Sequence, residues 1–125
     1  MSKEHRQFIR IREYLLTLVR FAKTGNVYRA LTKDIGGNGL RLLTEELIDA
    51  GAPVEVEIKL PDREEPIRFT GEVVWSKLVE KEQRSYKNPK AETGVKFLQI
   101  DPGDRTIITQ YAKLNALPGD EGARD

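Results

Sequence analysis

Residues 34–40 read DIGGNGL and place one carboxylate, Asp34, directly before a turn that is rich in glycine. Glycine adopts positive φ without a steric cost and lets the backbone approach a ligand closely. The glycines Gly36, Gly37 and Gly39 therefore predict either a tight turn or a cradle around a bound group. The stretch alone leaves both interpretations open, and the elements around it must decide between them.

Two arginines, Arg6 and Arg10, lie four residues apart in a strongly basic segment upstream of this turn. Residues 1–33 contain eight Lys or Arg and two acidic residues, a net charge of +6, whereas the whole chain has a net charge of +1. This asymmetry suggests that the first quarter of the chain meets an anion, which could be phosphate, nucleic acid or an acidic protein. A solvated basic face would have the same composition.

Several classes of protein are disfavoured by composition. The chain has no cysteine and a single histidine, His5, so disulfides, thiolate metal sites and multi-histidine metal sites are excluded. No nucleophile stands in a recognisable arrangement with a base, so we expect no catalytic residues and no enzyme. No apolar run reaches the roughly 18 residues of a membrane helix, and the first residues do not read as a secretory signal. We therefore expect a cytoplasmic protein without a membrane span or a cofactor.

Short segments of alternating hydrophobicity dominate the rest of the chain. Residues 53–59, PVEVEIK, alternate apolar and charged side chains, and residues 67–75, IRFTGEVVW, repeat the pattern with Trp75 on the apolar side. The turn residues between these two segments predict a hairpin, and Gly71 predicts a bulge or bend in its second strand. Further strands are expected over residues 11–22, 27–34, 40–43 and 93–100.

The last part of the chain predicts a helix instead. Asp101 can cap a helix that has Pro102 in its first turn. An apolar face of that helix would consist of Ile107, Ile108, Tyr111 and Leu114. Residues 77–92 read as a long charged hairpin loop, and residues 117–125 as a disordered tail. The fold class is thus all-β, an antiparallel barrel or sandwich with a terminal helix.

The order of these elements resembles the PilZ domain family, whose members commonly bind the bacterial second messenger cyclic di-GMP. The family has two signatures, RxxxR in an amino-terminal arm and [D/N]xSxxG after the second strand. RQFIR, residues 6–10, matches the first, and DIGGNG, residues 34–39, matches the second except that Gly36 replaces serine. GEVVWS and TGVKF follow in the expected order. The resemblance implies a six-stranded antiparallel barrel with a carboxy-terminal helix, divided into a basic arm (residues 1–12), a barrel with its helix (13–116) and a tail (117–125).

The resemblance also implies a ligand and roles for the signature residues. The guanidinium groups of Arg6 and Arg10 would bind the phosphates or guanine edges of cyclic di-GMP, as the arm folds over it. Asp34 would accept hydrogen bonds from guanine N1 and N2. Gly39 would supply a positive-φ turn, and Gly36 with Gly37 would direct backbone N–H groups toward the anion. A chain of this length leaves no room for an output domain, so a separate protein partner is expected.

Two other functions stay open at this stage. A PilZ-like protein that has lost the nucleotide and acts only through protein contacts would explain glycine at position 36. A small barrel that binds single-stranded nucleic acid would explain the basic first quarter, although few aromatic residues and an acidic remainder make nucleic acid an unlikely partner.

Overall fold

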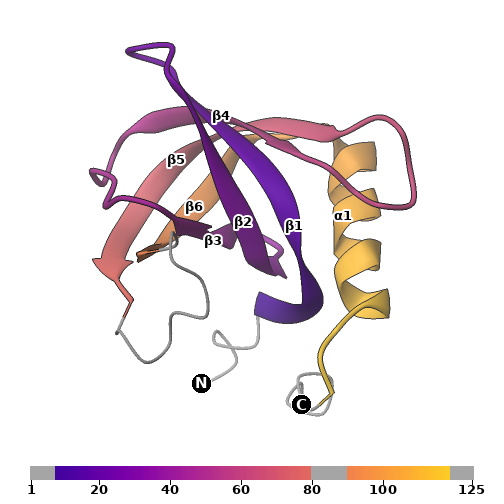
Figure 1. Ribbon diagram of the computed structural model, residues 1–125. Coiled ribbons are helices and arrows are strands. Elements are labelled where there is room, and N and C mark those ends of the chain that lie inside the picture. Colours follow the sequence, from indigo (N-terminus) through magenta and orange to yellow (C-terminus); the bar gives the residue numbers. More distant parts are fainter. Residues whose placement is uncertain (1–7, 80–89, 119–125) are drawn as a thin grey trace, which may run out of the picture.

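The computed structural model describes residues 8–79 and 90–118, and within these ranges it contains six strands followed by one helix (Figure 1). The elements are β1 (Phe8–Phe21), β2 (Val27–Gly36), β3 (Gly39–Thr44), β4 (Pro53–Ile58), β5 (Ile67–Leu78), β6 (Ala91–Gln99) and α1 (Pro102–Leu114). The predicted fold class, an all-β domain with a carboxy-terminal helix, is confirmed. The strand predicted over residues 11–22 is β1, which begins at Phe8 and ends at Phe21.

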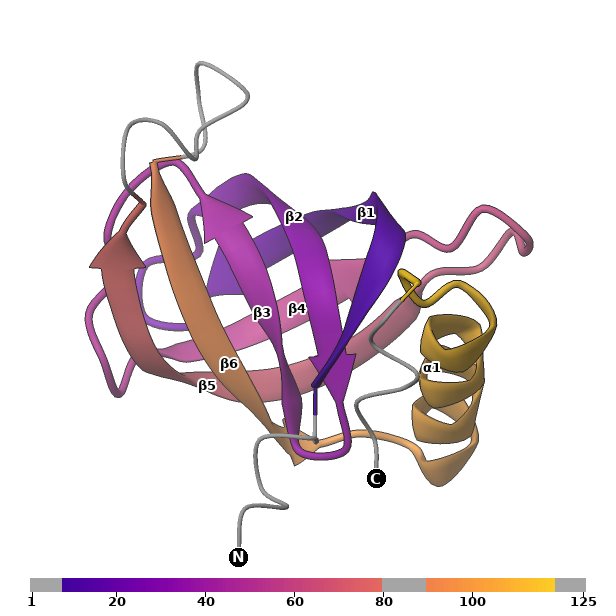
Figure 2. The same ribbon diagram turned by 90° about the horizontal axis from the view of Figure 1, so that it is seen from below.

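The six strands close into a single antiparallel barrel in the order β1-β2-β3-β6-β5-β4 (Figures 1 and 2). β4 pairs with β1 and completes the ring. The predicted hairpin is formed by β4 and β5, which pair from Pro53 opposite Glu72 to Ile58 opposite Ile67. Closure leaves no unpaired sheet edge along the ring, the usual way in which a small β-domain avoids edge-to-edge association.

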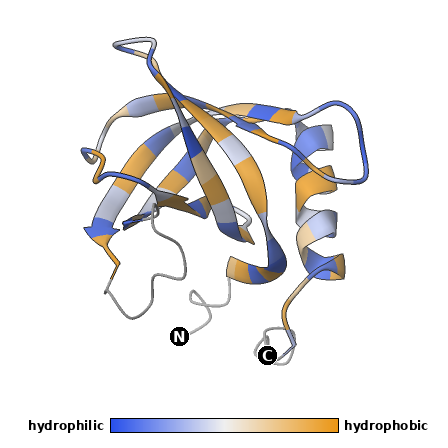
Figure 3. Cartoon of the chain, in the orientation of Figure 1, coloured by the Kyte–Doolittle hydropathy of each residue, from blue (hydrophilic) through white to orange (hydrophobic). Residues whose placement is uncertain are grey.

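Alternation of side chains explains why these residues form a barrel. In β4 the side chains of Val54, Val56 and Ile58 are buried, whereas Glu55 between them is exposed. Successive side chains of a strand point to opposite faces, so one apolar set from every strand fills the interior. Figure 3 shows the resulting change of hydropathy along each strand. Buried hydroxyl groups include those of Thr17 and Thr32, whose oxygens lie 2.7 Å apart and share a hydrogen bond.

Two irregularities change the direction of side chains along β5. The pairing of β5 with β6 shifts between Thr70 and Gly71, the position at which the sequence predicts a bulge. It shifts again between Val73 and Trp75, so Trp75 lies opposite Gly94. A Cβ added to Gly94 would lie 2.5 Å from the indole Nε1 of Trp75, which places the indole over the outer side of β6. Trp75 thus does not share the side of Ile67, Phe69 and Val73 as predicted, because the second bulge turns it to the outer face, where it packs on Gly94.

α1 begins as predicted and packs on the side of the barrel. Asp101 Oδ2 accepts hydrogen bonds from the backbone N–H groups of Gly103 and Asp104, at 3.0 and 3.4 Å. Ile108 and Ala112 are buried against the barrel, with Ile107 and Tyr111 partly buried beside them. Leu114 was predicted on the same face but is 84% exposed. In the part of the chain that is described, no helix is long and apolar enough to cross a membrane.

The chain after α1 returns to β1. In residues 115–117, hereafter the post-helix segment, the carbonyl of Asn115 accepts from the N–H of Arg12 at 2.8 Å. The N–H of Leu117 donates to the carbonyl of Arg10 at 2.9 Å, and Ala116 is bridged to Ile11. The pairing of β1 with β2 breaks between Arg10 and Leu15. The post-helix segment thus bonds β1 at the place where β2 leaves it.

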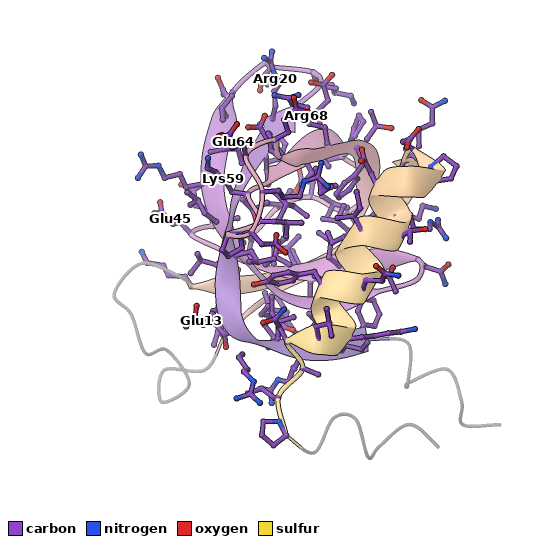
Figure 4. The ribbon with its side chains drawn as sticks, turned by 90° about the vertical axis from the view of Figure 1, so that its right-hand side faces the viewer. Glu13, Arg20, Glu45, Lys59, Glu64 and Arg68 are labelled. Carbon is purple, nitrogen blue, oxygen red and sulfur yellow. The ribbon has the colours of Figure 1, made fainter. Side chains whose placement is uncertain are left out.

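Charged side chains form short ladders on the outside of β1, β4 and β5. Arg20 lies 3.6 Å from Glu55, and Arg68 lies 3.2 Å from Glu57. Figure 4 shows Arg20 and Arg68 on the outer surface of the barrel. These side chains are largely exposed, so each pair contributes no more than about 1 kcal/mol of stability. Arg20 lies near the end of β1 that is far from Asp34, so its substitution is a suitable control for the site.

Candidate functional site

Asp34 lies near the end of β2 and is the most deeply buried carboxylate among the described residues, with 2% of its surface exposed. In the register of the sheet it stands between Arg10 on β1 and Arg41 on β3. The pairing of β2 with β3 shifts between Thr32 and Asp34, and this bulge puts Asp34 opposite Arg41 on the outer face. The carboxylate therefore lies on the outside of the sheet and is covered by its neighbours.

The two oxygens of Asp34 differ in their contacts. Oδ2 lies 3.5 Å from Nη1 of Arg41. Oδ1 is buried and has no hydrogen-bond partner in the structure as described. Burial raises the pKa of Asp34 above its ordinary value, against the opposing effect of the positive charges on Lys33, Arg41 and Arg10. A buried carboxylate oxygen without a partner is costly, and such a group is an indication of a site that a ligand completes.

The glycine turn after Asp34 has a different physical basis from the predicted one. Among the described residues positive φ occurs only at Gly25 and Gly51, so neither Gly36, Gly37 nor Gly39 supplies a left-handed turn. The predicted positive-φ role of Gly39 is therefore wrong. That Gly36 and Gly37 direct backbone N–H groups toward an anion stays a prediction.

Close approach of two strands is the reason for glycine at position 39. Gly39 pairs with Lys96 at the start of β3. An added Cβ would collide with the backbone carbonyl oxygen of Val95 and lie 2.8 Å from the Cα of Lys96. Gly37, in contrast, has no atom within 4 Å of an added Cβ. The turn is thus fixed by β3 and β6 at Gly39 and open at Gly37, where a ligand could approach the backbone.

The predicted arginines fall on either side of the boundary of the described residues. Arg10 lies in β1, exposed, and is the register partner of Asp34. Residues 1–7 of the predicted arm, which include Arg6 and His5, lie outside the described ranges. Gly36 is buried at the end of β2, opposite Phe8. The structure thus brings Arg10, Asp34 and the glycine turn together at one end of the barrel.

Two basic residues that the sequence analysis did not assign also lie beside Asp34. Arg41 forms the ion pair described above and also lies over the ring of Phe8, 4.3 Å from its centroid. Lys33 pairs with Glu92 on β6 at 3.3 Å, and both side chains are largely buried. The strand alternation around LRLL could have placed Arg41 on the outer face. Its contact with Asp34 depends on the bulge at Lys33, which leaves no mark in the sequence.

Beyond Arg41, the outer face of the sheet continues to the half-buried indole of Trp75. Arg41 is the register partner of Gly94 on β6, and Trp75 covers Gly94 from β5. The ammonium of Lys77 lies 5.6 Å from the centre of the Trp75 ring. Since the chain has one tryptophan, its fluorescence reports on this part of the surface.

A separate hollow of about 280 Å³ lies at the opposite end of the barrel, between the β1–β2 turn and the β3–β4 loop. Its lining is mainly apolar and includes Val19, Phe21 and Ala30. Charged residues such as Lys23 and Glu45 line it too, and the described residues form no ion pair between them. We therefore place the candidate site at the Asp34 end, where charges converge.

The arrangement around Asp34 is suited to binding a polar ligand. Within residues 8–79 and 90–118 no group of three or more His, Cys, Asp or Glu side chains could hold a metal ion. A carboxylate accepts two parallel N–H donors, one on each oxygen, such as those on the edge of a guanine. Flanking guanidinium groups bind phosphate oxygens or the other edge of the base.

Two solved structures have the same fold. The PilZ domain of YcgR from Escherichia coli, determined with cyclic di-GMP, has a TM-score of 0.65 and 12% identity over 86% of this chain and 87% of that one. The Bacillus subtilis inhibitor of motility MotI/DgrA has a TM-score of 0.68 and 19% identity over 86% of this chain. This chain covers 49% of MotI/DgrA. At these identities the likeness concerns the fold.

Sequence comparison identifies the family. No curated protein gave a significant match to the sequence. The family model of the PilZ domain matches residues 4–114, which include both signature segments and all six strands. The chain therefore belongs to the PilZ domain family, a family of cyclic di-GMP receptors.

Proposed function

We propose that this protein binds cyclic di-GMP at the Asp34 end of the barrel and passes the signal to a protein partner. The observation that carries the proposal is the buried Asp34 carboxylate, which has an oxygen without a hydrogen-bond partner among the described residues and stands between two arginines. Cyclic di-GMP offers guanine N–H donors to such an oxygen and phosphates to the arginines. Membership of the PilZ family supports the choice of this ligand.

Each signature residue has a distinct role in the proposal. Asp34 accepts from guanine N1 and N2 and thereby selects guanine. Arg6 and Arg10 donate to phosphate oxygens or to guanine O6 and N7. Gly36 and Gly37 bring backbone N–H groups near the ligand, whereas Gly39 acts by holding β3 against β6.

The signal would leave the site through β1. Arg10 contributes its side chain to the nucleotide site and its carbonyl to the hydrogen bond with Leu117. When the arm orders over the ligand, the same strand segment presents a new surface for a partner. The family membership fits this function, which requires no catalysis and no resident cofactor.

Titration of the purified protein tests the proposal. Isothermal titration calorimetry should show binding of cyclic di-GMP, and Trp75 fluorescence should change with the same midpoint. Arg6→Ala and Arg10→Ala should each weaken binding roughly ten- to hundredfold, because each removes a charge-assisted hydrogen bond. Arg20→Ala is the matched control and should bind as the wild type does, because Arg20 pairs with Glu55 far from the site.

Other outcomes would favour the alternative functions. Binding to neither cyclic di-GMP nor GTP would favour a PilZ protein that acts through protein contacts alone. Glycine at position 36, where the signature has serine, is compatible with that alternative. Binding of single-stranded RNA with a steep salt dependence would favour nucleic acid as the ligand. Either result would contradict the proposal.

The serine position offers a gain-of-affinity test. Gly36→Ser restores the family signature and adds one hydroxyl beside the ligand. A neutral hydrogen bond contributes about 0.5 to 1.5 kcal/mol, so the dissociation constant should fall by up to roughly tenfold. Calorimetry of both proteins at one salt concentration measures the change. Unchanged or weaker binding would show that the residue at position 36 does not face the ligand.

A further inference from the structure

Arg41 lies outside both family signatures but inside the candidate site. It belongs to β3, where its register partners are Asp34 on β2 and Gly94 on β6. Its Nη1 lies 3.5 Å from Asp34 Oδ2, and its side chain is 34% exposed. The guanidinium is therefore anchored on one side and open to solvent on another.

The guanidinium of Arg41 is also held by the start of β1. Its Cζ lies 4.3 Å from the centre of the Phe8 ring. A flat face on an aromatic ring and one edge on a carboxylate fix the plane of the group. A guanidinium carries five N–H donors, and a carboxylate oxygen uses one or two of them. Arg41 thus has donors left for a ligand that reaches Asp34.

The balance of charge at the site favours such a contact. Cyclic di-GMP brings two negative charges next to Asp34, which is a third. Arg6 and Arg10 supply two positive charges. Lys33 is already matched by Glu92 at 3.3 Å. Negative charge that is taken out of water needs a positive partner, so the site is one cation short without Arg41.

We propose that Arg41 is a third ligand-binding arginine, which donates to a phosphate of the nucleotide while it stays paired with Asp34. This inference rests on the proposed function, because it concerns the same site and ligand. Arg41 holds the charge of Asp34 in the free protein. In the complex it neutralises one phosphate, and Arg6 and Arg10 serve the remaining groups.

Calorimetric titration with cyclic di-GMP at several salt concentrations tests the role of Arg41. Arg41→Ala should weaken binding about tenfold. The slope of log K against log salt should also become shallower, because one of the charge pairs that salt screens is lost. Arg41→Lys keeps the charge without the fork and should recover part of the affinity and the full salt slope. Arg20→Ala, which also loses an exposed ion-paired arginine, should change neither quantity.

An indirect effect through Asp34 can be separated from a direct one. If Arg41 acted only by keeping Asp34 ionised, the defect of Arg41→Ala would vanish as the pH is raised, and this result would overturn the proposal. Tighter binding by Arg41→Ala would also overturn it, because Arg41 would then compete with the nucleotide for Asp34. Circular dichroism of each variant checks that the barrel is folded.

Titration of the wild type separates a failure of the proposed function from a failure of the role of Arg41 alone. Wild-type protein that does not bind cyclic di-GMP overturns the proposed function, and the role of Arg41 with it. Wild-type protein that binds, with Arg41→Ala equal to Arg20→Ala in affinity and salt slope, overturns the role of Arg41 alone.

Discussion

Replacing Asp34 by asparagine is expected to weaken cyclic di-GMP binding and, at the same time, to make the ligand-free protein more stable. Asparagine keeps the volume but replaces one acceptor by a donor, so one of the two guanine donors, N1–H or N2–H, loses its acceptor. A hydrogen bond to a charged group contributes about 1.5 to 3 kcal/mol, so losing one of the two should cost roughly ten- to hundredfold in affinity. Calorimetry measures this loss.

The gain in stability should depend on pH in a defined direction. Burial raises the pKa of Asp34 in the folded protein, so the folded state binds the proton more tightly than the unfolded chain does. The wild type is therefore penalised least below the unfolded pKa of about 3.9, and the penalty grows as the pH rises through the raised pKa of the folded state. Asparagine has no such penalty.

Urea denaturation of both proteins between acidic and neutral pH measures this difference. The free energy of unfolding of Asp34→Asn should match that of the wild type in acid and exceed it at neutral pH by up to about 1 kcal/mol, the lower range for a buried unsatisfied group. Asp49→Asn, at an exposed position in the loop after β3, controls for the removal of one negative charge. A less stable Asp34→Asn at neutral pH would contradict the explanation.

Gly39→Ala is expected to destabilise the barrel strongly. The new Cβ would overlap the backbone carbonyl of Val95, and backbone of the neighbouring strand cannot move aside as a side chain can. Overpacking of this kind costs roughly 1 to 3 kcal/mol or more, and a cost at the upper end is expected here. Separation of β3 from β6 would also displace Arg41, so nucleotide binding should fall with stability.

Gly37→Ala is the matched control for this substitution. It adds the same methyl group two residues away, where φ is not positive and no atom lies within 4 Å of the new Cβ. Its midpoint of urea denaturation should stay close to that of the wild type, whereas that of Gly39→Ala should fall. Equal midpoints for the two variants would show that β3 and β6 can separate at this point without cost.

Local patterns predicted most of the fold because the strands here obey their own periodicity. Val54, Val56 and Ile58 alternate in the sequence and are buried in the structure. The signal at Asp101 and Pro102 likewise marks the start of α1. The closure of six strands into one barrel came from the family resemblance, since alternation within a strand carries no information on its neighbours.

The parts of the site that escaped prediction depend on register. The bulges at Lys33 and Val74 decide which side chains face outward, and they bring Arg41 to Asp34 and Trp75 to Gly94. The wrong conformation predicted for Gly39 has another cause. A glycine required by a neighbouring backbone and one required by positive φ look the same in a sequence, and only the packing of β3 on β6 separates them.

The two hydrogen bonds between β1 and the post-helix segment couple events at opposite ends of the chain. If the main chain of Arg10 moves when a nucleotide binds, Leu117 must either move with it or lose its hydrogen bond to the Arg10 carbonyl. The free energy of ligand capture is then shared between the binding pocket and the anchorage of the helix. Weakening these two hydrogen bonds would raise the affinity for the nucleotide without changing its contacts. A protein that binds the end of α1 would then change the concentration of cyclic di-GMP at which the site fills.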